Sequence, residues 1–148
     1  MVAQTPDMMV FDATGKPYMA VEVNNQIGLT AEKATRFRKE VVPRLMGAST
    51  PFLMLASQER GYFWQKNDSA PAGAPPDLEF PMDQVIAHYR YTTDNDNSRR
   101  LRGSEVEILV WHWLVELAWK SPSAPIPDGL APMLKHIHGG NVTMESNS

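Results

Sequence analysis

The 148-residue sequence contains no cysteine. This absence excludes disulfides, zinc sites built on thiolates and cysteine nucleophiles, and it is typical of proteins in a reducing compartment. The opening residues also lack the basic start and the long apolar run of a signal peptide. We therefore expect a cytoplasmic protein.

Long hydrophobic runs and a strong excess of one charge are absent as well. The longest apolar stretch, 106–119, is interrupted by Glu107, His112 and Glu116, so it predicts a buried helix and no membrane contact. A formal net charge of −3 means that any contact with nucleic acid must come from a local basic patch. Hydrophobic residues make up 43% of the chain, which is enough for one core and predicts one domain.

What is present is a succession of short apolar segments and turns, which predicts an α/β (α+β) fold. We expect a central mixed sheet of about four strands flanked by helices. The sequence predicts strands at 8–13, 18–23, 51–57 and 62–65, and helices at 31–46, 81–91 and 104–119.

Turn and capping residues set the expected boundaries of these elements. The DATGKP segment at 12–17 predicts a tight turn that makes the first two strands a hairpin. Thr30 and Ser104 are expected to cap the first and last helices, and Pro43 to end or kink the first. The expected organisation is a hairpin–helix–hairpin core at 1–66, a loop with packing helices of the same domain at 67–120, and an irregular tail at 121–148.

Two acidic residues stand out, because Asp7 starts the first predicted strand and Glu22 lies near the end of the second. The hairpin brings them together. Two carboxylates at one end of a hairpin can hold Mg²⁺ or Mn²⁺ through oxygen ligands, while the ion keeps positions for water and phosphate.

With this spacing the sequence resembles the restriction-endonuclease-like superfamily that carries the PD-(D/E)xK motif. The matching residues are Pro6-Asp7 and Glu22-Val23-Asn24, and the resemblance extends over about 5–65. It implies a restriction-endonuclease-like core in which Asp7, Glu22 and the backbone carbonyl of Val23 bind the metal ion. It also implies a Mg²⁺-dependent endonuclease acting on DNA.

Asn24 stands where the motif has lysine, and an asparagine supplies hydrogen bonds without positive charge. In the Uma2-like branch, which this sequence also resembles, the lysine lies on the following helix. There Lys33 is followed four residues later by Phe37, a Lys-x-x-x-aromatic pattern. The resemblance thus leaves Asn24, Lys33 and Gln26 as three candidates for assisting water and phosphate.

The resemblance also implies a helix and a strand before the strand that carries Asp7, yet only six residues precede it. Three explanations stay open. The late helix 104–119 takes that place, another subunit covers the gap, or the fold is shortened.

Other polar residues are interpreted as structural. Asp12 is expected to stabilise its turn. His136 and His138, next to two glycines, are expected in a mobile tail. A solvated surface is the preferred interpretation for a set of basic side chains, and contact with phosphate is the alternative. These residues are Arg36, Arg38, Lys39, Arg99, Arg100 and Arg102.

Two other classes of function compete with the nuclease. A nuclease-fold module that has lost catalysis would bind nucleic acid or a protein partner without turnover. An assembly protein would dimerise through the apolar helix 104–119, whose tryptophans at 111, 113 and 119 we assign to packing.

Overall fold

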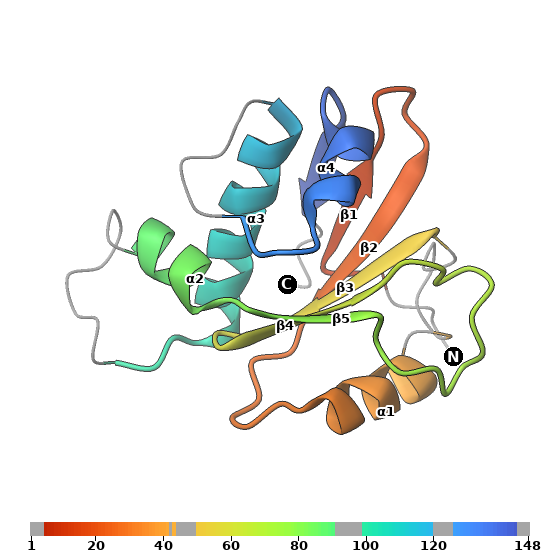
Figure 1. The fold of residues 1–148 in the computed structure, drawn as a ribbon. Coiled ribbons are helices and arrows are strands. Elements are labelled where there is room, and N and C mark those ends of the chain that lie inside the picture. The colour runs from red at the N-terminus through yellow and green to blue at the C-terminus, as the bar shows by residue number, and fades with distance from the viewer. Residues whose placement is uncertain (1–4, 42, 44–49, 91–98, 120–125, 145–148) are drawn as a thin grey trace.

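The computed structural model describes residues 5–41, 43, 50–90, 99–119 and 126–144. Within these residues a single mixed sheet is combined with helices on both of its faces (Figure 1). The elements in chain order are β1 (Met8–Phe11), β2 (Pro17–Val23), α1 (Ala31–Val41), β3 (Phe52–Ala56), β4 (Arg60–Trp64), β5 (Leu78–Pro81), α2 (Asp83–Arg90), α3 (Gly103–Trp119), α4 (Ala131–Ile137) and β6 (Asn141–Met144).

The sheet has six strands in the order β5-β4-β3-β2-β1-β6, so the expectation of about four was too low. The four predicted strands form its centre, and β5 and β6 were not predicted. Only β2 and β3 pair in parallel, and the chain crosses between them through α1; the other neighbours pair antiparallel. The predicted α+β class and mixed sheet are confirmed.

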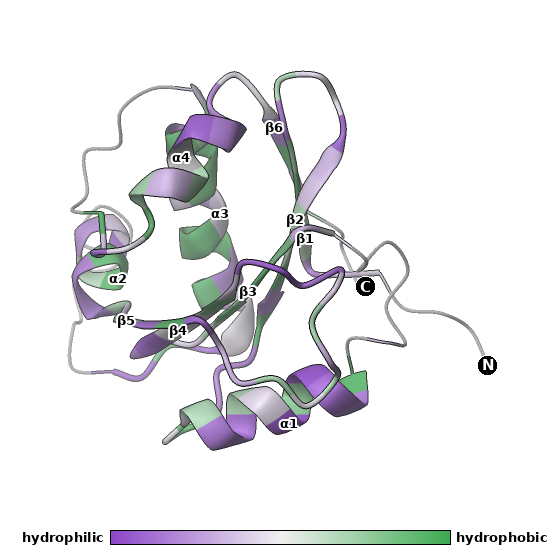
Figure 2. Cartoon of the chain, turned by 45° about the vertical axis from the view of Figure 1, so that its right-hand side comes forward, coloured by the Kyte–Doolittle hydropathy of each residue, from purple (hydrophilic) through white to green (hydrophobic). Residues whose placement is uncertain are grey.

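The two faces of the sheet are covered differently. α1 lies alone against one face, whereas α2, α3 and α4 lie on the other (Figure 1). The larger core fills the α3 face and includes the fully buried Trp113, Leu114 and Phe63. Figure 2 shows the same contrast in hydropathy, since α3 is mostly hydrophobic and α1 carries several hydrophilic residues.

The start of α1 follows from two local features. Gly28 adopts a φ of +71°, a left-handed conformation that glycine takes without strain, and it turns the chain towards the helix. The backbone N–H of Lys33 then donates to Oγ1 of Thr30 at 3.2 Å, so the predicted N-cap is confirmed. The helix is described to Val41, and most of its predicted last turn, with Leu45, lies outside the described residues.

The cap of α3 differs from the prediction. The helix begins at Gly103, and Ser104 is already inside it. The carboxylate of Glu105 accepts from the backbone N–H of Arg102 at 2.9 Å, which makes Arg102 the residue at the helix start. Glu105, the third residue of the helix, thus satisfies the N–H of the residue at the helix start, and Ser104 is not the cap.

Most of α3 is buried, as its composition predicts, because it packs against α2, α4 and the sheet. Its three tryptophans differ, however. Trp113 is fully buried and Trp111 packs partly against the same core, but Trp119 is 72% exposed and does not pack there. Within the described residues, no helix combines the length and the apolar character needed to cross a membrane.

The predicted irregular tail contains a helix and a strand instead. β6 pairs antiparallel with β1, with Met8 opposite Met144 and Phe11 opposite Asn141. Gly140 permits this approach, since a Cβ there would come within 1.9 Å of the carbonyl oxygen of Phe11. Therefore β1 is not an edge strand, and β6, with α3 packed on it, fills the place beside it.

Candidate functional site

Asp7 and Glu22 lie side by side where β1 begins and β2 ends. The register places Met8 opposite Val21, so the next pair along the hairpin is Asp7 and Glu22. The backbone N–H of Asp7 donates to Oε1 of Glu22 at 3.2 Å, and the N–H of Val23 donates to Oδ2 of Asp7 at 2.8 Å. The hairpin therefore brings the two predicted carboxyl groups together and fixes them through the backbone.

Both carboxyl groups are on the α1 face of the sheet and are nearly inaccessible. Side chains alternate along a strand, so Glu22 shares its face with Ala20, which packs in the cluster that includes Ala34 of α1. Each acidic residue is only 8% exposed. Acidic side chains are seldom buried without a partner of opposite charge.

The electrostatics of this pair disfavour two negative charges side by side. Burial, followed by the charge of Asp7 and a hydrogen bond to its side chain, raises the pKa of Glu22 to about 8. The charge of Glu107 acts in the same direction. At neutral pH Glu22 therefore keeps its proton unless a cation replaces it.

Glu107 is a third acidic residue of the site that the sequence did not reveal. It lies on α3, which contacts β2 from the other face of the sheet. Burial and then the charge of Asp7 raise the pKa of its carboxyl group. A glutamate within the apolar stretch 106–119 was the available signal in the sequence, but its partners lie in the first hairpin, far away in the chain.

The arrangement fits a hard divalent cation bound through few protein ligands. Among the described residues, no group of three or more histidine, aspartate or glutamate side chains is placed to bind one metal ion together. Asp7 and Glu22 are the two carboxyl groups that touch, and Glu107 approaches as a further negative charge. Oxygen donors with room for water suit Mg²⁺ or Mn²⁺.

Asn24 is oriented by its own turn. Its N–H donates to the carbonyl of Ala56 at 2.9 Å, and its Oδ1 accepts from the N–H of Gln26 at 3.3 Å. The side-chain oxygen is thus occupied, and the Nδ2 group is the part of Asn24 that can donate to a phosphate or water oxygen. Gln26 is exposed beside it.

Lys33 is exposed in the first turn of α1. Among the residues that the structure describes, no ion pair joins it to Asp7 or Glu22. Lys33 lies on the helix that follows Glu22, as the sequence predicts. In the described residues its ammonium group is not paired with either carboxyl group of the site.

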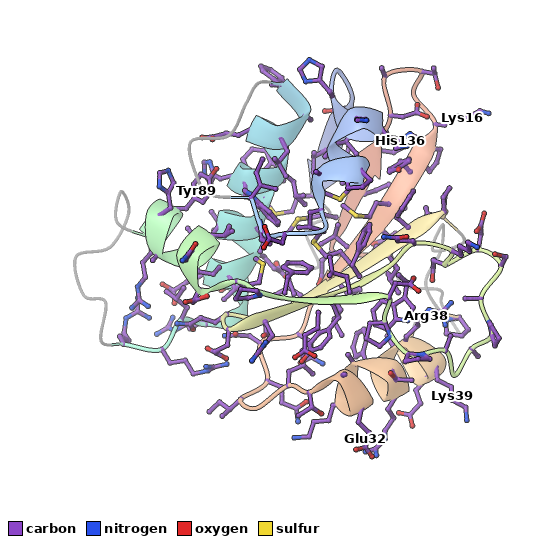
Figure 3. All side chains as sticks on the ribbon, viewed as in Figure 1. Lys16, Glu32, Arg38, Lys39, Tyr89 and His136 are labelled. Carbon is purple, nitrogen blue, oxygen red and sulfur yellow. The ribbon has the colours of Figure 1, made fainter. Side chains whose placement is uncertain are left out.

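The remaining polar residues fall mainly into structural roles. Oδ1 of Asp12 accepts from the N–H groups of Thr14 and Lys16, at 2.9 and 3.0 Å, which confirms its predicted role in the turn. His136 does not belong to a loose tail, because it lies on α4 and stacks on Tyr18 with ring centroids 5.1 Å apart (Figure 3). His138 is exposed just beyond α4.

The basic residues singled out in the sequence are also distributed differently. Arg38 is only 5% exposed and points into the fold, so it is not available to phosphate. Arg99 pairs with Glu105 and Arg100 with Glu59, at 2.9 and 2.8 Å. Exposed basic side chains that do remain are Arg36, Lys39 and Arg102.

Comparison with protein-family models, curated proteins and solved structures finds no match to this chain.

Proposed function

We propose that this protein is a metal-dependent nuclease that hydrolyses phosphodiester bonds in DNA, with Asp7 and Glu22 as its metal ligands. The observation that carries the proposal is the buried, mutually bonded carboxyl pair, in which the pKa of Glu22 is raised to about 8. Burying two acids together costs free energy, and a divalent cation offsets that cost.

The surroundings of the pair support this proposal. The resemblance to PD-(D/E)xK nucleases implies a helix and a strand before the strand that carries Asp7. In the fold, β6 pairs with β1 and α3 packs against β6 and β2, so these two elements are of the kinds that the resemblance implies. The proposal assigns them that role, which favours the late helix over a second subunit or a shortened fold.

Each residue then has a defined task. Asp7 and Glu22 hold the cation, with the carbonyl of Val23 as a further ligand, and Glu107 adds negative charge from α3. The bound cation would activate water and stabilise the charge that develops on the phosphate. Nδ2 of Asn24 donates to a phosphate or water oxygen, while Gln26 and Lys33 contact the substrate from the exposed connection and helix.

The test is cleavage of supercoiled and linear DNA with Mg²⁺ or Mn²⁺. Asp7→Asn and Glu22→Gln keep the size of each side chain but remove the charged ligand, so each should abolish cleavage. Glu32→Gln on the exposed face of α1 is the matched control and should cleave as the parent does. Equal cleavage by all four proteins contradicts the assignment.

Catalytically inactive binding is the second candidate, and a specific observation favours it. Asn24 carries no charge and, among the described ion pairs, Lys33 is not joined to the carboxyl groups, so neither residue holds a positive charge in place of the motif lysine. Titration with Mn²⁺ in a calorimeter separates the two functions. Metal binding with metal-dependent cleavage supports the nuclease, whereas DNA or protein binding without either supports the inactive module.

The structure leaves less apolar surface on α3 for a homodimer than the sequence indicated. The buried side of the helix faces its own domain, which leaves Ile108 and Trp119 as its exposed large apolar residues. Light scattering at micromolar concentration tests it, since a monomer under those conditions excludes a stable dimer.

A further inference from the structure

Beside the acidic pair, three separate segments meet at one asparagine. Nδ2 of Asn25 donates to the carbonyl of Leu101 at 2.7 Å, just before α3. Oδ1 of Asn25 accepts from the N–H of Gln58, in the turn between β3 and β4, at 3.0 Å. The side chain therefore ties the connection after β2 to the entrance of α3 and to a neighbouring turn.

Arg100 reinforces this junction with its guanidinium group. One arm donates to the carbonyl oxygen of Asn25 at 2.8 Å and to its Oδ1 at 3.2 Å. The other arm donates to Oε2 of Glu59 at 2.8 Å. In addition, the N–H of Leu101 donates to Oε1 of Gln58 at 3.0 Å. We call these five residues, Asn25, Gln58, Glu59, Arg100 and Leu101, the Asn25 clamp.

The Asn25 clamp joins the segment that follows Glu22 to the segment that precedes the helix carrying Glu107. Asn25 follows Glu22 by three residues and directly follows Asn24, whose side chain closes the turn to Gln26. Leu101 precedes Glu107 by six residues, and Glu107 lies on α3, the helix that contacts β2. A shift of α3 relative to the end of β2 would change the spacing of all these groups.

We propose that Asn25 and Arg100 are positioning residues that set the distance between Glu107 on α3 and the Asp7–Glu22 pair. The inference rests on the proposed function and deepens it, because it names the residues that tune cation binding without touching the cation. Residues that orient ligands in this indirect way commonly change metal affinity by about tenfold to a hundredfold when they are replaced.

The first measurement uses Asn25→Ala in the full chain. We expect calorimetric affinity for Mn²⁺ to fall by about tenfold or more. At saturating Mn²⁺ the kcat for DNA cleavage should remain reduced while KM for DNA changes little, since the metal still binds in an altered geometry. A residue with only a structural role would lower the melting temperature and leave these quantities unchanged in the folded protein.

Two further variants test whether the effect of Asn25→Ala comes from the loss of its side-chain hydrogen bonds. Asn25→Asp keeps the oxygen that accepts from Gln58 and Arg100 but loses the donor to Leu101, so it should lie between the parent and Asn25→Ala. If Asn25→Ala does not fold, this variant carries the same test. The matched control is Arg60→Ala, which removes the nearby exposed ion pair between Arg60 and Glu79 (3.4 Å) without touching Asn25. It should bind Mn²⁺ as the parent does.

A double variant tests whether Asn25 and Arg100 act together on Mn²⁺ binding. If they do, Asn25→Ala combined with Arg100→Ala should weaken Mn²⁺ binding no more than the stronger single change does. Additive losses would mean that the two residues act separately, and they would overturn the joint role.

The outcomes separate this inference from the proposed function. Metal-dependent cleavage that needs Asp7 and Glu22, together with unchanged Mn²⁺ affinity and kcat in a folded Asn25 variant, overturns the positioning role alone. A parent protein that neither binds Mn²⁺ nor cleaves DNA overturns both.

Discussion

The two faces of the sheet use their side chains in different ways. On the α3 face, three helices and the sheet enclose an almost entirely apolar core around Trp113, Leu114 and Phe63. On the α1 face a single helix covers a smaller apolar cluster, and Glu22 and Arg38 are buried on that side as well. The α3 face therefore buries most of the apolar core, and the stability gained there offsets the cost of burying charged groups on the α1 face.

The largest expected effect tests whether the α3 face contributes more to the free energy of unfolding than the α1 face does. Leu114→Ala empties a fully buried position on the α3 face and should lower the free energy of unfolding by about 2–5 kcal/mol. Phe37→Ala on the α1 face is the comparison, and it should cost less because Phe37 is only partly buried. Denaturant unfolding measures both. An equal or larger loss for Phe37→Ala would contradict the larger contribution of the α3 face.

The second prediction concerns the cost of the acidic pair. The pKa of Glu22 is raised from 4.5 in the unfolded chain to about 8 in the folded one. Below pH 4.5 both states hold the proton and no penalty arises. Between pH 4.5 and 8 the folded state alone keeps it, so stability falls by up to about 1 kcal/mol per pH unit as pH rises.

Glu22→Gln removes this penalty, because glutamine does not ionise. The variant should melt at a higher temperature than the parent at pH 8, and the difference should shrink towards pH 4.5. In the parent, Mn²⁺ should raise the melting temperature at pH 8, while the variant should respond less. A difference that is independent of pH would argue against the raised pKa.

The third prediction concerns the polar support of the α1 face. The guanidinium of Arg38 donates to the carbonyls of Pro71 and Asn67 at 2.6 and 3.1 Å, and it lies 5.7 Å from the ring centroid of Trp64 (Figure 3). Arg38→Ala removes these hydrogen bonds and should cost about 1–3 kcal/mol. Limited proteolysis of the 66–76 loop should report the same loss.

Arg38→Lys is the informative companion to that change. An ammonium group lacks the planar fork that serves several carbonyls at once, so lysine should recover little of the lost stability. Full recovery would show that the positive charge alone matters at this position.

The smallest effect is expected on the outer side of the same helix. Glu32 and Arg36 form an exposed ion pair at 3.8 Å, with side chains 85% and 63% exposed. Arg36→Ala should therefore change the free energy of unfolding by no more than about 0.5 kcal/mol. A larger loss would show that the exposed side of α1 contributes more than its burial indicates.

Local signals in the sequence were sufficient for the centre of the fold. Short apolar segments, the DATGKP turn and the Thr30 cap predicted β1, β2 and the start of α1, and with them the pairing of Asp7 with Glu22. These features depend on residues that are close together in the chain, so periodicity and turn chemistry reveal them.

The missing parts depend on distant partners. β6 has only four residues, follows two glycines and is stabilised by pairing with β1 about 130 positions earlier in the chain. Glu107 belongs to the site only because α3 packs against the end of β2. A glutamate within an apolar helix is a local signal, but no local feature of either segment identifies its distant partner.

The pairing of β6 with β1 has a consequence for the order of the chain. Met144 lies opposite Met8, so a short linker from residue 144 to residue 5 would join the end of β6 to the start of β1. New ends opened between β5 and α2 would give a circular permutant. Its elements would follow in the order α2, α3, α4, β6, β1, β2, α1, β3, β4 and β5. In that permuted order a helix and a strand precede the strand beginning after Asp7, with every neighbour in the sheet retained.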